Sequence, residues 1–102
     1  MKPIVTREIL EKNGFDYHKQ VIHDFNYHWI DEFYYLYGGN WKKEHYKGEG
    51  WAVKITYRDG KLAFVEVITK DSFKFIKHNP VCYIQDINNA LKFYGINFEI
   101  KQ

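Results

Sequence analysis

The sequence predicts an α+β protein: an antiparallel sheet of four to six strands with an N-terminal and a C-terminal helix packed on one face. A helical pattern lies near each end of the chain, and the middle is rich in β-branched and aromatic residues. That middle contains an Asp-Gly pair between two apolar segments, which is typical of an antiparallel hairpin. Because 102 residues is the size of one domain, we assign residues 1–102 to a single domain.

The first element is a short helix that begins after Thr6. Thr6 is a suitable N-cap, and Glu8 in the first turn complements the helix dipole. Asn13 and Gly14 end the helix, with Gly14 expected in the left-handed conformation. Phe15 follows directly, and we expect it to anchor the turn in the core.

Residues 16–50 carry weaker signals. Residues 27–37 are densely aromatic, and they predict either one bent strand or a tight hairpin that turns at Asp31 and Glu32. Residues 41–50 are polar, end in glycines and lack apolar periodicity, so we expect an exposed loop there.

The clearest signal is the hairpin that follows. Residues 51–57 alternate between apolar and polar side chains, and residues 62–69 are β-branched. Asp59 and Gly60 between them favour a tight turn. A third, shorter strand is predicted at residues 73–76, which makes this region an antiparallel meander.

The last helix is predicted to begin after Pro80, because the residue before a proline avoids helical geometry. Gly95 ends this helix, and Asn88 is among the polar residues expected to face water. Residues 96–101 alternate again, and they predict a final strand at the edge of the sheet. The apolar face of the helix comprises Ile84, Ile87, Ala90, Leu91 and Tyr94.

Composition restricts the protein class. A net charge of +2 does not require a nucleic-acid or membrane partner, and a single cysteine, Cys82, excludes an internal disulfide. No segment approaches the ~18 apolar residues of a membrane span. The first fourteen residues lack the apolar core of a signal peptide, so we expect a cytoplasmic protein.

The aromatic content of 20% is the outlier, because so many large rings can hardly all be buried in a small domain. We expect a partly hydrated, aromatic sheet face beside the loop at residues 41–47. Rings next to lysines suit a protein partner or a homodimer, and they also suit single-stranded nucleic acid. A polar loop with its rings folded onto the sheet explains the same composition. The candidate binding residues are Tyr34, Tyr37, Trp41, Lys42, Lys43, Tyr46 and Lys47.

Metal and cofactor sites are not expected. His18, His23 and His28 recur at every fifth residue. This spacing does not bring all three to the same side of a strand, and it does not bring them to the same side of a helix. No metalloprotease motif, thiolate cluster or phosphate-binding glycine loop is present.

A small hydrolase built on Glu66 or Cys82 is the less favoured alternative. Cys82 precedes the last helix, and His78 is four residues away, but a lone cysteine is usually a small core residue. Glu66 is buried if Leu62 and Phe64 face the core, and it is hydrated if Ala63, Val65 and Val67 do so instead. We favour the hydrated arrangement and a protein that is not an enzyme.

Two segments carry a resemblance. Residues 10–15 read Leu-Glu-Lys-Asn-Gly-Phe, and residues 83–96 form a helix that ends in Gly-Ile. Together they resemble small uncharacterised proteins of gut bacteria and of their phages or mobile elements. The resemblance implies a bacterial or phage accessory protein, and it transfers no activity. The sequence thus predicts a protein-interaction module, with residues 96–100 as an edge strand for dimerisation.

Overall fold

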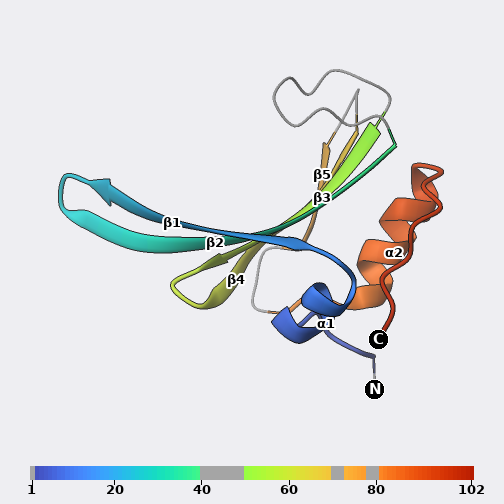
Figure 1. Cartoon of the computed structure of the whole chain (residues 1–102), viewed down its shortest axis with the longest axis horizontal. Coiled ribbons are helices and arrows are strands. Elements are labelled where there is room, and N and C mark those ends of the chain that lie inside the picture. Colours follow the sequence, from blue (N-terminus) through green and yellow to red (C-terminus); the bar gives the residue numbers. More distant parts are fainter. Residues whose placement is uncertain (1, 40–49, 70–72, 78–80) are drawn as a thin grey trace.

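The protein folds into a five-stranded antiparallel sheet with two helices, which confirms the α+β prediction (Figure 1). The computed structural model describes residues 2–39, 50–69, 73–77 and 81–102. The strands are adjacent in chain order, and every neighbouring pair is antiparallel. The elements are α1 (Arg7–Lys12), β1 (Asp16–Asp24), β2 (Tyr27–Gly39), β3 (Gly50–Arg58), β4 (Lys61–Thr69), β5 (Phe73–Lys77) and α2 (Ile84–Phe93).

Helix α1 has the predicted caps. The Thr6 hydroxyl accepts a hydrogen bond from the Ile9 amide at 3.2 Å, which satisfies one of the unpaired donors of the first turn. Asn13 is the C-cap, and Gly14 follows with a φ of 83°, in the region where a side chain would be strained. Phe15 is buried in the core, as expected.

The β3–β4 hairpin is also confirmed. Its turn residues, Asp59 and Gly60, have φ values of 49° and 80°. The register shifts between Thr56 and Tyr57, so that Tyr57 lies opposite Leu62 and both side chains face the core. The predicted third strand is present as β5.

Strands β1 and β2 differ from the expectation for this region. Strand β2 runs without interruption through Asp31 and Glu32, so the alternative of a hairpin turning at these residues is wrong. The turn lies instead at residues 25–26, between β1 and β2. Acidic residues are tolerated in mid-strand because each is paired: Asp31 with Arg58 on one face and Glu32 with Arg7 on the other.

One core cluster joins α1, α2 and one face of the sheet. From the sheet, Tyr34, Val53 and Ile55 contribute to it, and Leu10 comes from α1. Helix α2 contributes its four predicted apolar residues, which are all buried in the same cluster: Ile84, Ile87, Ala90 and Leu91. The N-terminal segment is tied to the start of α2 through the bridge between Ile4 and Tyr83.

The C-terminal tail corrects a prediction, because residues 96–101 form no strand. Asn88 accepts a hydrogen bond from the Ile100 amide at 2.8 Å and donates one to the Ile100 carbonyl at 3.1 Å. Asn13 pairs with both backbone groups of Lys101 in the same way, at 2.9 and 2.7 Å. These asparagine side chains replace a neighbouring strand, so the tail offers no edge for dimerisation. Asn88 contacts the tail rather than facing water.

No helix in the part of the chain that the structure describes has the length and apolar character needed to cross a membrane.

Candidate functional site

The two predicted binding residues that the structure describes do not share one surface. Tyr34 is only 2% exposed and packs in the core between the rings of Tyr17 and Tyr57, at 5.2 and 5.9 Å, so its assignment to a binding surface is wrong. Tyr37 lies on the opposite face of β2, where its ring stacks on Tyr35 at 5.8 Å. The other five candidates, Trp41, Lys42, Lys43, Tyr46 and Lys47, lie outside the described residues.

The face of the sheet opposite the core cluster carries aromatic rings, as expected. Two cations lie over these rings: Lys54 Nζ is 4.8 Å from the centre of the Phe33 ring, and Arg58 Cζ is 5.1 Å from the centre of a Trp29 ring. Because the cations already cover parts of the rings, the stacking surface left for a nucleobase is reduced. The rings of this aromatic face are Trp29, Phe33, Tyr35, Tyr37 and Phe64.

A shallow depression of about 320 Å³ lies on the aromatic face. Arg58 is bound by Asp31 through two hydrogen bonds of 2.9 and 3.1 Å, and this contact holds the pKa of Asp31 below its usual value. Lys54 lies opposite Glu66. The two cations are thus matched by two carboxylates, and the depression has no excess positive charge for phosphate. Its lining comprises Asp31, Phe33, Lys54, Thr56, Arg58, Phe64 and Glu66.

Glu66 lies between the two alternatives that the sequence allows, a buried carboxylate and a hydrated one. Val65 and Val67 are fully buried in the core, so Glu66 lies on the opposite face, as favoured. It is half-buried rather than fully hydrated, and burial raises the pKa of its carboxyl while Lys54 lowers it. The other candidate catalytic residue of the hydrolase alternative is Cys82. It is buried in the core, and its thiol donates to the Tyr83 carbonyl at 3.6 Å.

Residues 21–30 form a β-hairpin arm (Figure 1), and this arm carries several of the exposed large apolar side chains among the described residues. Strand β2 begins to pair with β3 only at Asp31, so beyond this point β1 and β2 form a two-stranded ribbon that projects from the sheet. Its base is fixed by Asp59, whose carboxylate accepts from the Ile30 amide at 3.0 Å and whose amide donates to the Ile30 carbonyl at 2.8 Å.

The arm ends in an exposed phenylalanine. Phe25 is fully exposed at 100%, and its φ of 44° is unfavourable for a side chain of this kind. Tyr27 is 70% exposed, Val21 53% and Ile30 37%. Burial of these side chains by a partner would remove a large apolar area from water. The sequence did not indicate the arm, because residues 25–26 lack the Asn-Gly or Asp-Gly pattern of a two-residue turn.

Two histidines face each other on the arm. His23 and His28 are cross-strand partners, and their Nδ1 atoms are 2.6 Å apart. The five-residue spacing brings them together because the chain reverses between them, a geometry that neither a single strand nor a single helix provides. His18 lies elsewhere, opposite Phe33. Among the described residues, no three histidine, cysteine or acidic side chains form a metal-binding group.

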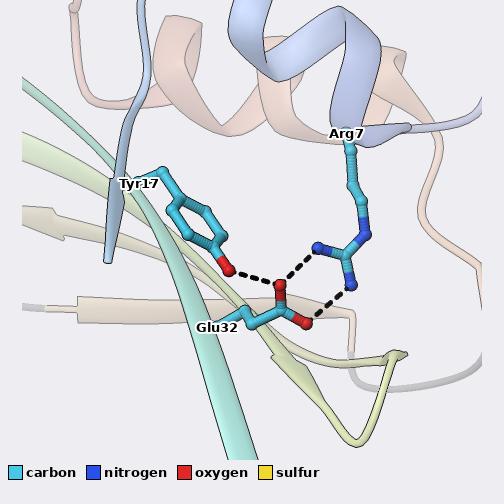
Figure 2. A network of polar contacts seen from close by, with 3 residues as sticks. All are labelled: Arg7, Tyr17 and Glu32. Carbon is cyan, nitrogen blue, oxygen red and sulfur yellow. Dashed lines mark hydrogen bonds and ion pairs between the residues drawn. The ribbon is translucent and has the colours of Figure 1, made fainter. Parts of the chain in front are cut away.

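An ion pair joins α1 to the sheet on the core side, next to the arm (Figure 2). Arg7 donates two hydrogen bonds to Glu32, at 2.8 and 3.0 Å, and the Tyr17 hydroxyl donates a third at 2.5 Å. These contacts lower the pKa of Glu32 to about 2. The hydrogen bonds from Arg7 have the largest effect, and the one from Tyr17 has the next largest. The Arg7 guanidinium also lies 4.4 Å from the centre of the Tyr57 ring. Because both carboxylate oxygens of Glu32 accept hydrogen bonds from within the fold, we interpret this network as a structural connection.

Comparisons with known proteins add no identification. No family model, curated protein or solved structure matches this chain. The resemblance to small bacterial and phage proteins therefore stays a prediction, and so does the cytoplasmic location.

Proposed function

We propose that this protein is a non-enzymatic protein-interaction module, and that the arm at residues 21–30 is its contact surface. The observation that carries the proposal is the exposed apolar tip of the arm, with Phe25 and Tyr27 projecting beyond the sheet. Aromatic side chains of this kind often dominate the binding energy of protein interfaces. A two-stranded ribbon is marginally stable in water, and a bound partner would stabilise it.

The test is photo-crosslinking in cells that express the protein. A photoreactive phenylalanine analogue replaces Phe25 in one version and Phe93 in the other. Phe93 is a matched control because it is 77% exposed and lies on α2, away from the arm. We expect a discrete crosslinked protein band from position 25 that is absent from position 93. Equal crosslinking from both positions, or none from position 25, contradicts the proposal.

A second pair of variants tests the chemistry of the contact. Phe25→Ser and Tyr27→Ser remove apolar contact area at the tip, and each should abolish the crosslink from a probe placed at Ile30. Phe93→Ser should leave that crosslink unchanged. If the serine variants crosslink as well as the parent protein, the apolar tip does not contribute to binding.

Single-stranded nucleic acid is the second candidate ligand. The parallel rings of Tyr35 and Tyr37 favour it, because stacked aromatic side chains can extend a stack of bases. The paired charges of the depression weigh against it. Size-exclusion chromatography with a mixed oligonucleotide at low salt separates the two candidates, since co-elution that disappears with added salt is expected only for nucleic-acid binding.

A further inference from the structure

The outer edge of β1 is suited to strand pairing. Strand β1 is the terminal strand of the sheet, and among the described residues no strand pairs with its outer side. It is nine residues long and keeps an uninterrupted register with β2. Natural edge strands are usually protected by prolines, bulges or several charges. No proline or bulge interrupts β1, and between Asp16 and Asp24 at its two ends Lys19 is its only lysine, arginine, aspartate or glutamate.

The backbone groups that face outward follow from the turn. Asp24 and Tyr27 are partners on either side of a two-residue loop, and such residues exchange hydrogen bonds. Hydrogen-bonding groups alternate along a strand, so every second residue counted from Asp24 bonds to β2. The amides and carbonyls of Tyr17, Lys19, Val21 and His23 therefore point toward the outer edge.

We propose that this edge pairs, antiparallel and about a two-fold axis, with the same edge of a second copy of the chain, centred on Val21. The proposal rests on the function proposed above and names the partner of the arm. In a symmetric pair the residues that lie opposite each other have numbers with a constant sum, so the centre fixes every other contact.

Repulsion between like charges disfavours the neighbouring registers. A pair centred on Gln20 places Asp16 opposite Asp24 of the other copy twice, and a pair centred on Lys19 places two lysines opposite each other. Like charges in direct opposition destabilise a sheet. Centring on Val21 places His18 opposite Asp24 and Lys19 opposite His23 of the other copy, and it brings no two acidic residues and no two lysines into opposition.

The Val21 register also gives the longest pairing that avoids these repulsions. It pairs residues 18–24 of both copies, whereas a pair centred on Ile22 involves only residues 20–24. The two exposed Val21 side chains meet at the centre, on the face that also carries Ile30. Each arm then becomes part of a four-stranded segment, which removes the instability of an isolated ribbon.

The test is the oligomeric state of the purified full chain, measured by sedimentation over a range of concentrations. We expect a monomer–dimer equilibrium in the parent protein. Val21→Lys places two ammonium groups opposite each other at the centre, so the dissociation constant should rise by about tenfold or more. Val81→Lys is the matched control, since it adds the same charge at another exposed valine that lies outside the arm.

A charge-complementary pair provides a positive test. Val21→Glu alone should also dissociate the dimer, and an equimolar mixture of Val21→Lys and Val21→Glu should restore it as a heterodimer. A monomer at every concentration overturns the proposal, as does a dimer that tolerates both variants. Equal loss in Val81→Lys indicates a general effect of the added charge and also overturns it. If the chain is a monomer but Phe25 still crosslinks to another protein, only the choice of partner fails.

Discussion

Gly38 has a packing role that its position in the sequence does not reveal. It lies directly opposite Trp51, and the indole ring of Trp51 occupies the space that a side chain at residue 38 would need. The same indole stacks on Phe98 at 5.5 Å, which connects the sheet to the C-terminal tail. A glycine at this point thus allows a tryptophan to cover the end of the core.

Gly38→Ala should therefore destabilise the protein by about 1–3 kcal/mol, because the ring must move and lose its contact with Phe98. Urea unfolding followed by circular dichroism measures the change. In a Trp51→Val background the alanine meets a smaller side chain, so the penalty should fall to near zero in a double-mutant cycle. An equal penalty in both backgrounds would show that the ring is not the cause.

Glu32 predicts a specific response to acid. Its pKa is lowered from 4.5 to about 2 by Arg7 and Tyr17. Between these two pH values the carboxylate stays charged in the folded protein, whereas it is protonated in the unfolded chain. The stabilisation is complete above about pH 5 and is lost as the pH falls through 4.5 toward 2. Because Arg7 is partly exposed, we expect about 1 kcal/mol.

Unfolding of the parent protein and of Glu32→Gln between pH 7 and pH 2 measures this contribution. The difference between them should be constant near neutrality and should disappear at the acid end. Arg7→Gln breaks the same pair from the other side, and its profile should have the same shape. A difference that persists at pH 2 would assign the effect to packing rather than to the ion pair.

At the scale of elements, the sequence predicted those parts whose determinants are local. The β3–β4 hairpin contains its Asp-Gly turn, and α1 contains its own N-cap and terminal glycine. Strand β2 was uncertain because Arg7 and Arg58, the partners of its two acidic residues, are 25 and 27 positions away. Alternation alone therefore could not show that β2 runs through both carboxylates.

The candidate site was predictable only in part, for the same reason. The aromatic face follows from alternation along β2, but alternation does not show which side is the core, and Tyr34 was consequently misplaced. The arm depends on how far β2 extends beyond β3, which is a matter of register between distant strands. The tail has the alternation of a strand, yet it is held by Asn13 and Asn88, whose roles no local pattern indicates.

The contribution of the C-terminal tail to stability can be tested by substitution of Asn88. Asn88→Ala leaves the amide and carbonyl of buried Ile100 without their partner, which should cost about 1–3 kcal/mol. The adjacent exposed residue, Asn89, provides the control, because its replacement by alanine brings the same gain in helix propensity. Thermal unfolding of both variants should show a lower midpoint for Asn88→Ala alone. Similar midpoints would mean that the tail contributes little to stability.

At the scale of the whole molecule, stability should fall from the centre of the sheet toward the tip of the arm. Strands β3 and β4 contain the fully buried residues Val53, Ile55, Val65 and Val67, and they are covered by the core cluster. The arm has strand pairing but no covering layer among the described residues, so its hydrogen bonds open with little loss of apolar burial. Amide hydrogen exchange should therefore be slower in β3 and β4 than in residues 21–30.

Amide exchange along β1 can also show whether this edge pairs with a second copy, because outward and inward hydrogen-bonding groups alternate along the strand. In a dilute monomer the outward amides of Val21 and His23 should exchange faster than the amide of Ile22, which bonds to β2. Pairing of two β1 edges protects the outward amides, so the odd–even contrast should diminish as concentration rises. Exchange measured by NMR at two concentrations, with Val21→Lys as the monomeric reference, follows each amide separately. A contrast that is independent of concentration in the parent protein would mean that β1 remains an unpaired edge, and it would exclude a second copy as the partner of this edge.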